Sequence, residues 1–213
     1  DGMGGHNAGE IASRIAVDTF TEEASLFDAT NIRISSLPNR LKKFLSEIVF
    51  TIDRKIIKAS KNKDGCFGMG TTAIMCAVFG RTAVIGNVGD SRAYIINKIT
   101  GISQISVDHS VVEALVQSGQ ITRDEMEKHP SKNAITRALG FLEDEGADIF
   151  VKDIARGERL LLCSDGLNSM VPDEKIEEIV TKTKFVKSAC KKLIESANTN
   201  GGADNITVAV IQP

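Results

Sequence analysis

Two long amphipathic patterns occupy the first sixty residues. Apolar side chains recur every three or four positions over residues 7–23 and again over residues 38–60. This spacing predicts two helices, each with one apolar face turned towards a core. Pro38 suits the first turn of the second helix, where its missing N–H would have no intrahelical partner in any case.

The middle of the chain has the pattern of short strands. Residues 71–79, 82–87 and 92–97 are apolar and rich in β-forming side chains, and glycines and short polar turns separate them. Strands so close in sequence are typical of an antiparallel meander.

Further elements follow in blocks rather than in strict alternation. Helical patterns cover residues 109–118 and briefly 123–128, and strands are predicted at 148–152, 159–163 and 206–211, with two amphipathic helices between the last two strands. Blocks of this kind favour an α+β fold, in which mainly antiparallel sheets are covered by helices.

Composition limits the class of partner. The 213 residues include 42% hydrophobic residues and carry a net charge of −2. A nucleic-acid binder would usually show a basic excess, so no nucleic-acid partner is predicted. No apolar run has the length that crosses a bilayer, so no membrane partner is predicted either.

Four cysteines stand at positions 66, 76, 163 and 190, without the spacing of a CxxC pair. Three of them lie inside apolar runs, which favours buried free thiols over disulfides or a zinc site. Free thiols predict a reducing, cytoplasmic setting.

Four aspartates lie at the boundaries of predicted strands, and they are the candidates for chemistry. Asp1 precedes Gly2, Asp90 follows Gly89, Asp165 precedes Gly166, and Asp204 stands just before the last strand. Carboxylates that converge repel one another unless a cation lies between them, and oxygen ligands favour Mg²⁺ or Mn²⁺. Taken singly, each aspartate also suits a turn or a helix cap, so this alternative stays open.

The glycine-rich opening, residues 2–9, does not fit a phosphate-binding loop. No Gly-Lys-Ser/Thr follows it, and Asn7 stands where GxGxxG would need its third glycine. A tight turn that leads into a helix is the interpretation that remains.

A set of strings in family order resembles the bacterial type of the protein phosphatase 2C family. The resemblance covers essentially the whole chain. The strings are Asp1-Gly2-Met3-Gly4-Gly5-His6, Gly70-Thr71-Thr72-Ala73, Asn87-Val88-Gly89-Asp90-Ser91-Arg92-Ala93-Tyr94, Asp108-His109-Ser110, Ile135-Thr136-Arg137-Ala138-Leu139-Gly140, Ser164-Asp165-Gly166-Leu167 and Ala203-Asp204-Asn205-Ile206-Thr207.

The resemblance implies a four-layer α-β-β-α sandwich with two mainly antiparallel sheets. It also implies hydrolysis of phosphoserine and phosphothreonine in proteins by a metal-activated water, with two Mn²⁺ or Mg²⁺ ions and a third beside them. Asp1, the carbonyl of Gly2, Asp165 and Asp204 would hold metal, and Asp90 with Asp165 would match the third site. Phosphorylated proteins, namely a Ser/Thr kinase and its substrates, are the implied partners.

The chain also departs from the family pattern. The family has a strand or two before the position of Asp1, with an acidic residue and often a phosphate-gripping arginine. We therefore expect residues 1–213 to form a single catalytic domain that is incomplete at its N-terminus. Met3 stands where animal members have a histidine, and His6, three residues further on, is a candidate general acid. The alternative function is a non-catalytic regulatory or binding module with the same fold.

Overall fold

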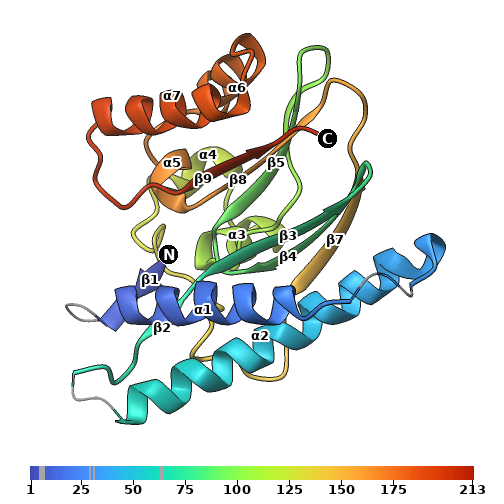
Figure 1. The fold of residues 1–213 in the computed structure, drawn as a ribbon. Helices are drawn as coiled ribbons and strands as arrows, with labels where there is room; N and C mark the ends of the chain where they lie inside the picture. The colour runs from blue at the N-terminus through green and yellow to red at the C-terminus, as the bar shows by residue number, and fades with distance from the viewer. Residues whose placement is uncertain (5–7, 29, 31, 63–64) are drawn as a thin grey trace.

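The helices and strands of the computed structural model are stacked in four layers (Figure 1). The structure describes residues 1–4, 8–28, 30, 32–62 and 65–213. One outer layer holds helices α1 (Ala8–Ser25) and α2 (Leu37–Asn62), and the opposite outer layer holds α6 (Asp173–Lys182) and α7 (Val186–Thr199). Between them lie a sheet of β3 (Ala73–Phe79), β4 (Thr82–Val88) and β7 (Asp148–Asp153), and a sheet of β6 (Gly101–Gln104), β5 (Arg92–Asn97), β8 (Arg159–Cys163) and β9 (Val208–Ile211). The predicted α+β sandwich is confirmed.

Alternation along the strands explains why each sheet is covered on both faces. In β4, Val84 packs with the core under α1 and α2, whereas Ile85 packs with the core between the two sheets. In β5, Ile95 faces that same middle core, and Tyr94 joins the core under α6 and α7. Successive strand residues point to opposite faces, so each strand serves two apolar layers.

The predicted three-strand meander is wrong in its third strand. All strand pairs of the two larger sheets are antiparallel, but β5 lies in the second sheet, beside β6 and β8. The edges of β4 are already occupied by β3 and β7, so the chain must leave this sheet after Val88. It does so at Gly89, whose φ of +106° lies in the region that favours glycine.

Several short elements complete the chain. The predicted strand 71–79 is split at Thr72: β2 (Gly70–Thr71) pairs with β1 (Gly2–Met3), while β3 pairs with β4. The other short elements are the 3₁₀ turn η1 (Ile34–Ser36) and helices α3 (Val111–Gln117), α4 (Arg123–Met126) and α5 (Asp165–Asn168). No helix among the described residues is long and apolar enough to span a membrane.

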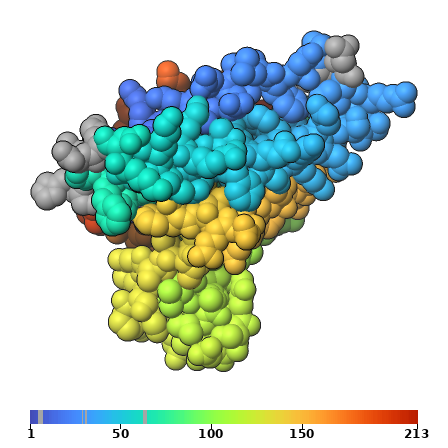
Figure 2. All heavy atoms as spheres, turned by 90° about the horizontal axis from the view of Figure 1, so that it is seen from below, coloured from blue at the N-terminus to red at the C-terminus, as the bar shows by residue number. Residues whose placement is uncertain are grey.

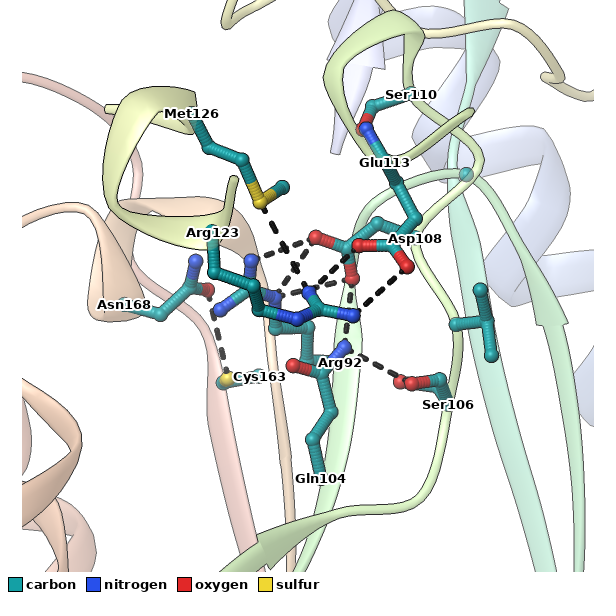
Figure 3. A network of polar contacts seen from close by, with 12 residues as sticks. Arg92, Gln104, Ser106, Asp108, Ser110, Glu113, Arg123, Met126, Cys163 and Asn168 are labelled. Atoms are coloured by element: carbon teal, nitrogen blue, oxygen red, sulfur yellow. Dashed lines mark hydrogen bonds and ion pairs between the residues drawn. The ribbon is translucent and has the colours of Figure 1, made fainter. Parts of the chain in front are cut away.

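Residues 110–135, called the lobe below, project from the layered body (Figure 2). Two arginine–carboxylate pairs organise the lobe and its base (Figure 3). At the base, the Arg92 guanidinium donates to both oxygens of Asp108, with Nη2 at 2.6 Å from Oδ2. Within the lobe, Arg123 of α4 donates to both oxygens of the buried Glu113 of α3, at 2.7 and 3.0 Å. Planar pairs of this type fix orientation as well as distance.

Candidate metal centre

Three of the four candidate aspartates meet at one end of the sandwich. Asp1 precedes β1, Asp165 is the first residue of α5 at the end of β8, and Asp204 lies in the loop that leads to β9. One carboxylate oxygen from each residue lies within 4.8 Å of the others. The fold thus brings together carboxylates that are up to about two hundred positions apart in the sequence.

Ser164 joins the segments that carry Asp165 and Asp204. Its hydroxyl donates to the Asn205 carbonyl (3.2 Å) and accepts from the Thr207 N–H (3.1 Å), and its own N–H donates to the Thr207 carbonyl. Gly166 lets the two segments approach closely, because a Cβ at this position would collide with the Asn205 carbonyl oxygen. Asp204 is held locally, since its Oδ1 accepts from the Asn205 N–H at 2.7 Å.

Two threonines fix the backbone of Asp1. The Asp1 carbonyl accepts from the Thr72 N–H and from the Thr71 hydroxyl, each at 2.8 Å. Gly2, a predicted ligand through its carbonyl, lies in β1, and a side chain there would collide with the backbone of Gly9 at the start of α1. Glycine at both positions therefore allows the first strand to lie against the helix.

The electrostatics of the cluster suit a cation. Burial, followed by the negative charge of Asp204, raises the pKa of Asp165 above its ordinary value. The Oδ1 atom of Asp165 is buried and, among the residues that the structure describes, has no hydrogen-bond partner. A buried acceptor without a donor is costly unless another group neutralises it. Oxygen ligands in this number and charge match a hard divalent ion.

Asp90 lies beside this cluster rather than inside it. It follows Gly89 in the turn between β4 and β5 and is half-buried. Burial, with a further contribution from the charge of Asp165, raises the pKa of Asp90 to about 6. The two carboxylates are therefore close enough to sense each other, whereas the group within 4.8 Å contains only Asp1, Asp165 and Asp204 among the described residues.

The three histidines of the chain differ in where they lie. His6 lies outside the described residues, so its role as a general acid stays a prediction. His109 is buried and lies between the Gly89 backbone and the Asp148 carboxylate. His129 lies half-buried in the lobe, where its Nδ1 accepts from the Ser131 N–H at 3.1 Å.

The sequence alone predicts no role for the supporting hydroxyl groups. Thr71 and Thr72 belong to the second family string and Ser164 to the sixth, but a hydroxyl residue beside a glycine or an aspartate has no distinctive pattern by itself. Their function depends on contacts with residues 41 to 71 positions away. Only the adjacency of Ser164 to Asp165 is a signal that the sequence offers.

A cavity of about 590 Å³ opens beside Asp1. Asp1, Gly2, Ser91, Ser164 and Asn205 line it on the side of the candidate centre. It continues between α1 and the edge strands of the two sheets, where Arg14, Ala73 and Ala209 are among its lining residues. The candidate centre is therefore reached from the surface of the molecule.

Comparisons with known proteins agree with this architecture. The family model described as protein phosphatase 2C matches residues 1–206. The serine/threonine phosphatase stp of Listeria monocytogenes is 36% identical over 216 residues, which cover 100% of this chain and 82% of the relative. The solved serine/threonine phosphatase of S. agalactiae superposes with a TM-score of 0.87 at 36% identity, covering 99% of this chain and 84% of that one.

A further solved structure contains metal. The catalytic domain of the serine threonine protein phosphatase PstP, in complex with two manganese ions, is similar with a TM-score of 0.82 at 32% identity. The match covers 99% of this chain and 83% of that one. Together with the family model, which spans nearly all of the sequence, these similarities show that the chain belongs to the protein phosphatase 2C family.

Proposed function

We propose that this protein hydrolyses phosphoserine and phosphothreonine in proteins, and that it needs a divalent cation held by Asp1, Asp165 and Asp204. The observation that carries the proposal is the convergence of these carboxylates around a buried oxygen, Asp165 Oδ1, that has no donor among the described residues. Membership of a phosphatase family and similarity to the serine/threonine phosphatase stp of Listeria monocytogenes support the same reaction.

The proposed ion is Mn²⁺ or Mg²⁺, because both accept hard oxygen ligands. We propose two ions at Asp1, the Gly2 carbonyl, Asp165 and Asp204, in line with the two manganese ions of the similar PstP structure. A third ion would use Asp90 together with Asp165. The raised pKa values of these two carboxyls support this arrangement, since a cation would offset the burial, and then the repulsion between carboxylates, that raise them.

The chain's own residues hold the reacting groups in place. When bound, the ions supply a water nucleophile near neutral pH and neutralise charge on the phosphoryl oxygens. Thr71 and Thr72 fix the Asp1 backbone, and Ser164 keeps Asp165 next to Asp204. This pre-set geometry orients the carboxylates before the substrate arrives, which limits the reorganisation needed during the reaction.

The proposed partners are phosphorylated proteins, specifically a bacterial Ser/Thr kinase and its substrates. We further propose that residues 1–213 act as one catalytic domain, which the family match over residues 1–206 supports. The four free cysteines support a reducing, cytoplasmic setting.

Residue selectivity tests the proposal. Three peptides of identical sequence, carrying phosphoserine, phosphothreonine or phosphotyrosine, would be compared for phosphate release in Mn²⁺. We expect release from the first two and at least about tenfold less from the third, because its longer, rigid side chain places phosphorus further from the peptide backbone. Preferred release from phosphotyrosine would contradict the proposed substrate class.

A further inference from the structure

One buried titratable residue close to the centre has no role in the proposed reaction. His109 lies between β6 and α3 and is only 7% exposed. Its N–H donates to the Gly89 carbonyl at 3.0 Å, and its Nδ1 accepts from the Gly89 N–H, also at 3.0 Å. Both polar groups of Gly89, the residue before Asp90, are therefore bound by a single histidine.

The other side of the ring is held as well. Because Nδ1 accepts a hydrogen bond from the Gly89 N–H, the ring hydrogen belongs on Nε2, which donates to Asp148 Oδ2 at 3.2 Å. Arg137 Nη1 also lies 3.2 Å from Nε2, and with the hydrogen on Nε2 its own hydrogen bond goes to Asp148. The second oxygen of Asp148 accepts from Arg137 Nη1 at 2.8 Å, and Arg137 Nη2 pairs with Glu145 at 2.8 Å. Burial acts to raise the pKa of Asp148, but hydrogen bonds from Arg137 and His109 outweigh it and hold the pKa below its ordinary value. Asp148 therefore stays a carboxylate that fixes both the tautomer and the orientation of the ring.

The turn that His109 holds is packed tightly on its other side. A Cβ on Gly89 would lie 2.5 Å from Thr72 Cγ2, and the Thr72 hydroxyl contacts the Ser91 hydroxyl at 2.9 Å. Asn87 adds a third restraint, because its Nδ2 donates to the carbonyls of Gly89 (3.2 Å) and Val107 (3.1 Å). The residues on either side of Asp90 are thus held between Thr72 and His109, which limits the positions that the Asp90 carboxylate can reach.

We propose that His109 is a positioning residue: it fixes the Gly89–Asp90 turn and thereby places the Asp90 carboxylate beside Asp165. The link through Asp148 and Arg137 ties this turn to the segment that follows the lobe. The inference rests on the proposed function, because it gives Asp90 a part in binding the cation. It assigns no proton transfer to His109, whose Nδ1 is occupied by a backbone N–H.

Two substitutions separate the two sides of the ring. In His109→Asn, the amide oxygen stands at the position of Nδ1 and can still accept from the Gly89 N–H, while the contact with Asp148 is lost. In His109→Gln, the amide reaches towards Asp148 but leaves no acceptor for the Gly89 N–H. Asp148→Asn is a milder third variant, since it keeps the imidazole ring but replaces its carboxylate partner with a neutral amide.

The measurement is Mn²⁺ binding by calorimetry, alongside the Mn²⁺ concentration that gives half-maximal phosphate release. We expect His109→Gln to weaken Mn²⁺ binding about tenfold at the site that Asp90→Asn also weakens. His109→Asn should stay within about threefold of the wild type, because the bond to Gly89 is retained. The double variant His109→Gln/Asp90→Asn should bind Mn²⁺ no more weakly than Asp90→Asn alone, since both changes act through one carboxylate.

Additive losses of Mn²⁺ binding free energy in the double variant would overturn the inference. Equal losses of Mn²⁺ affinity in His109→Gln and His109→Asn would overturn it as well. If circular dichroism shows that His109→Gln does not fold, Asp148→Asn decides: a smaller loss of Mn²⁺ affinity in the same site supports positioning, and unchanged affinity overturns it. Absence of phosphate release by the wild type would contradict the proposed function instead, while the calorimetric comparison would still test His109.

Discussion

Asp165 is the residue on which most of the candidate chemistry converges. It lies within reach of Asp1, Asp204 and the charge of Asp90, and its Oδ1 is buried without a donor among the described residues. We expect Asp165→Asn to lower Mn²⁺-dependent turnover at least about 100-fold, because an amide offers one neutral oxygen in place of a carboxylate. The metal-free variant should melt at the same temperature as the wild type or higher, because the repulsion from Asp204 is relieved.

A matched control for this change is Asp18→Asn, which alters an exposed aspartate of α1 that pairs with Arg14 at 3.6 Å. Its turnover should stay close to that of the wild type. The ligand assignment fails if Asp165→Asn retains near-normal turnover in Mn²⁺ while Asp18→Asn behaves as expected.

Asp90 gives a prediction for the pH dependence of stability without metal. Its pKa is raised from an ordinary 3.8 to about 6 in the folded state. The folded state therefore holds this proton more tightly, so the stability that it contributes is present below about pH 4 and is lost as the pH rises through about 6. The full shift corresponds to about 3 kcal/mol, and partial solvent exposure reduces this figure.

The test compares Asp90→Asn with the wild type in EDTA at several pH values. The variant cannot titrate at this position, so its melting temperature should rise relative to that of the wild type between pH 4 and pH 7. In saturating Mn²⁺ this trend should shrink or reverse. A difference that is constant with pH would show that Asp90 is not perturbed in the folded protein.

At the level of single residues, the sequence shows the candidate carboxylates more clearly than the groups that support them. Aspartates beside glycines at strand ends are visible in the chain, and the ordered family strings point to the same four positions. Ser164 and Thr72 act through backbone groups that lie far away in the sequence, and such contacts depend on the sheet register. The pairing of His109 with Gly89 is hidden for the same reason.

At the level of elements, the end of β8 and the start of β9 must stay aligned for Asp165 and Asp204 to meet. Ser164→Ala removes two hydrogen bonds that span this junction. We expect it to lower the free energy of unfolding by about 1–2 kcal/mol and to raise the Mn²⁺ concentration needed for half-maximal turnover. Urea unfolding and a Mn²⁺ titration would measure the two effects.

Ser118→Ala is the corresponding control. Ser118 follows the last residue of α3, and its exposed hydroxyl donates a hydrogen bond to the Leu115 carbonyl. This substitution should change the free energy of unfolding by no more than a few tenths of a kcal/mol. The Mn²⁺ concentration needed for half-maximal turnover should stay the same. If Ser164→Ala leaves the Mn²⁺ requirement unchanged, the alignment of β8 with β9 does not position the carboxylates.

Helix and strand prediction succeeded where one period dominated. The patterns at 7–23 and 38–60 correspond to α1 and α2 within two residues at each end, because long amphipathic stripes have a single interpretation. Neither β6 nor α5 is predicted, since each has only four residues and one of them is a glycine, which weakens both helix and strand signals. The placement of β5 in the second sheet could not be inferred from its closeness to β4, because it depends on β7, some sixty residues later, as a neighbour of β4.

At the level of the whole molecule, two sheets and two helix layers meet so that three separate segments deliver carboxylates to one end. The middle core joins β4 and β5 directly, so the Asp90 turn between them is fixed to both sheets. Small displacements of one sheet against the other would therefore change the distances within the candidate centre. A rigid, well-packed interior resists such displacement, and this supports the geometry on which the proposed reaction depends.

The most direct test is phosphate release from a phosphothreonine peptide in Mn²⁺, then after EDTA, and then after Mn²⁺ is restored, with Asp165→Asn assayed in parallel. We predict release that requires Mn²⁺, stops in EDTA and returns on restoration, with almost none from the variant. Release that persists in EDTA, or that the variant matches, would contradict a metal-dependent phosphatase centred on these carboxylates. Absence of release by the folded wild type in Mn²⁺ would favour the non-catalytic module instead.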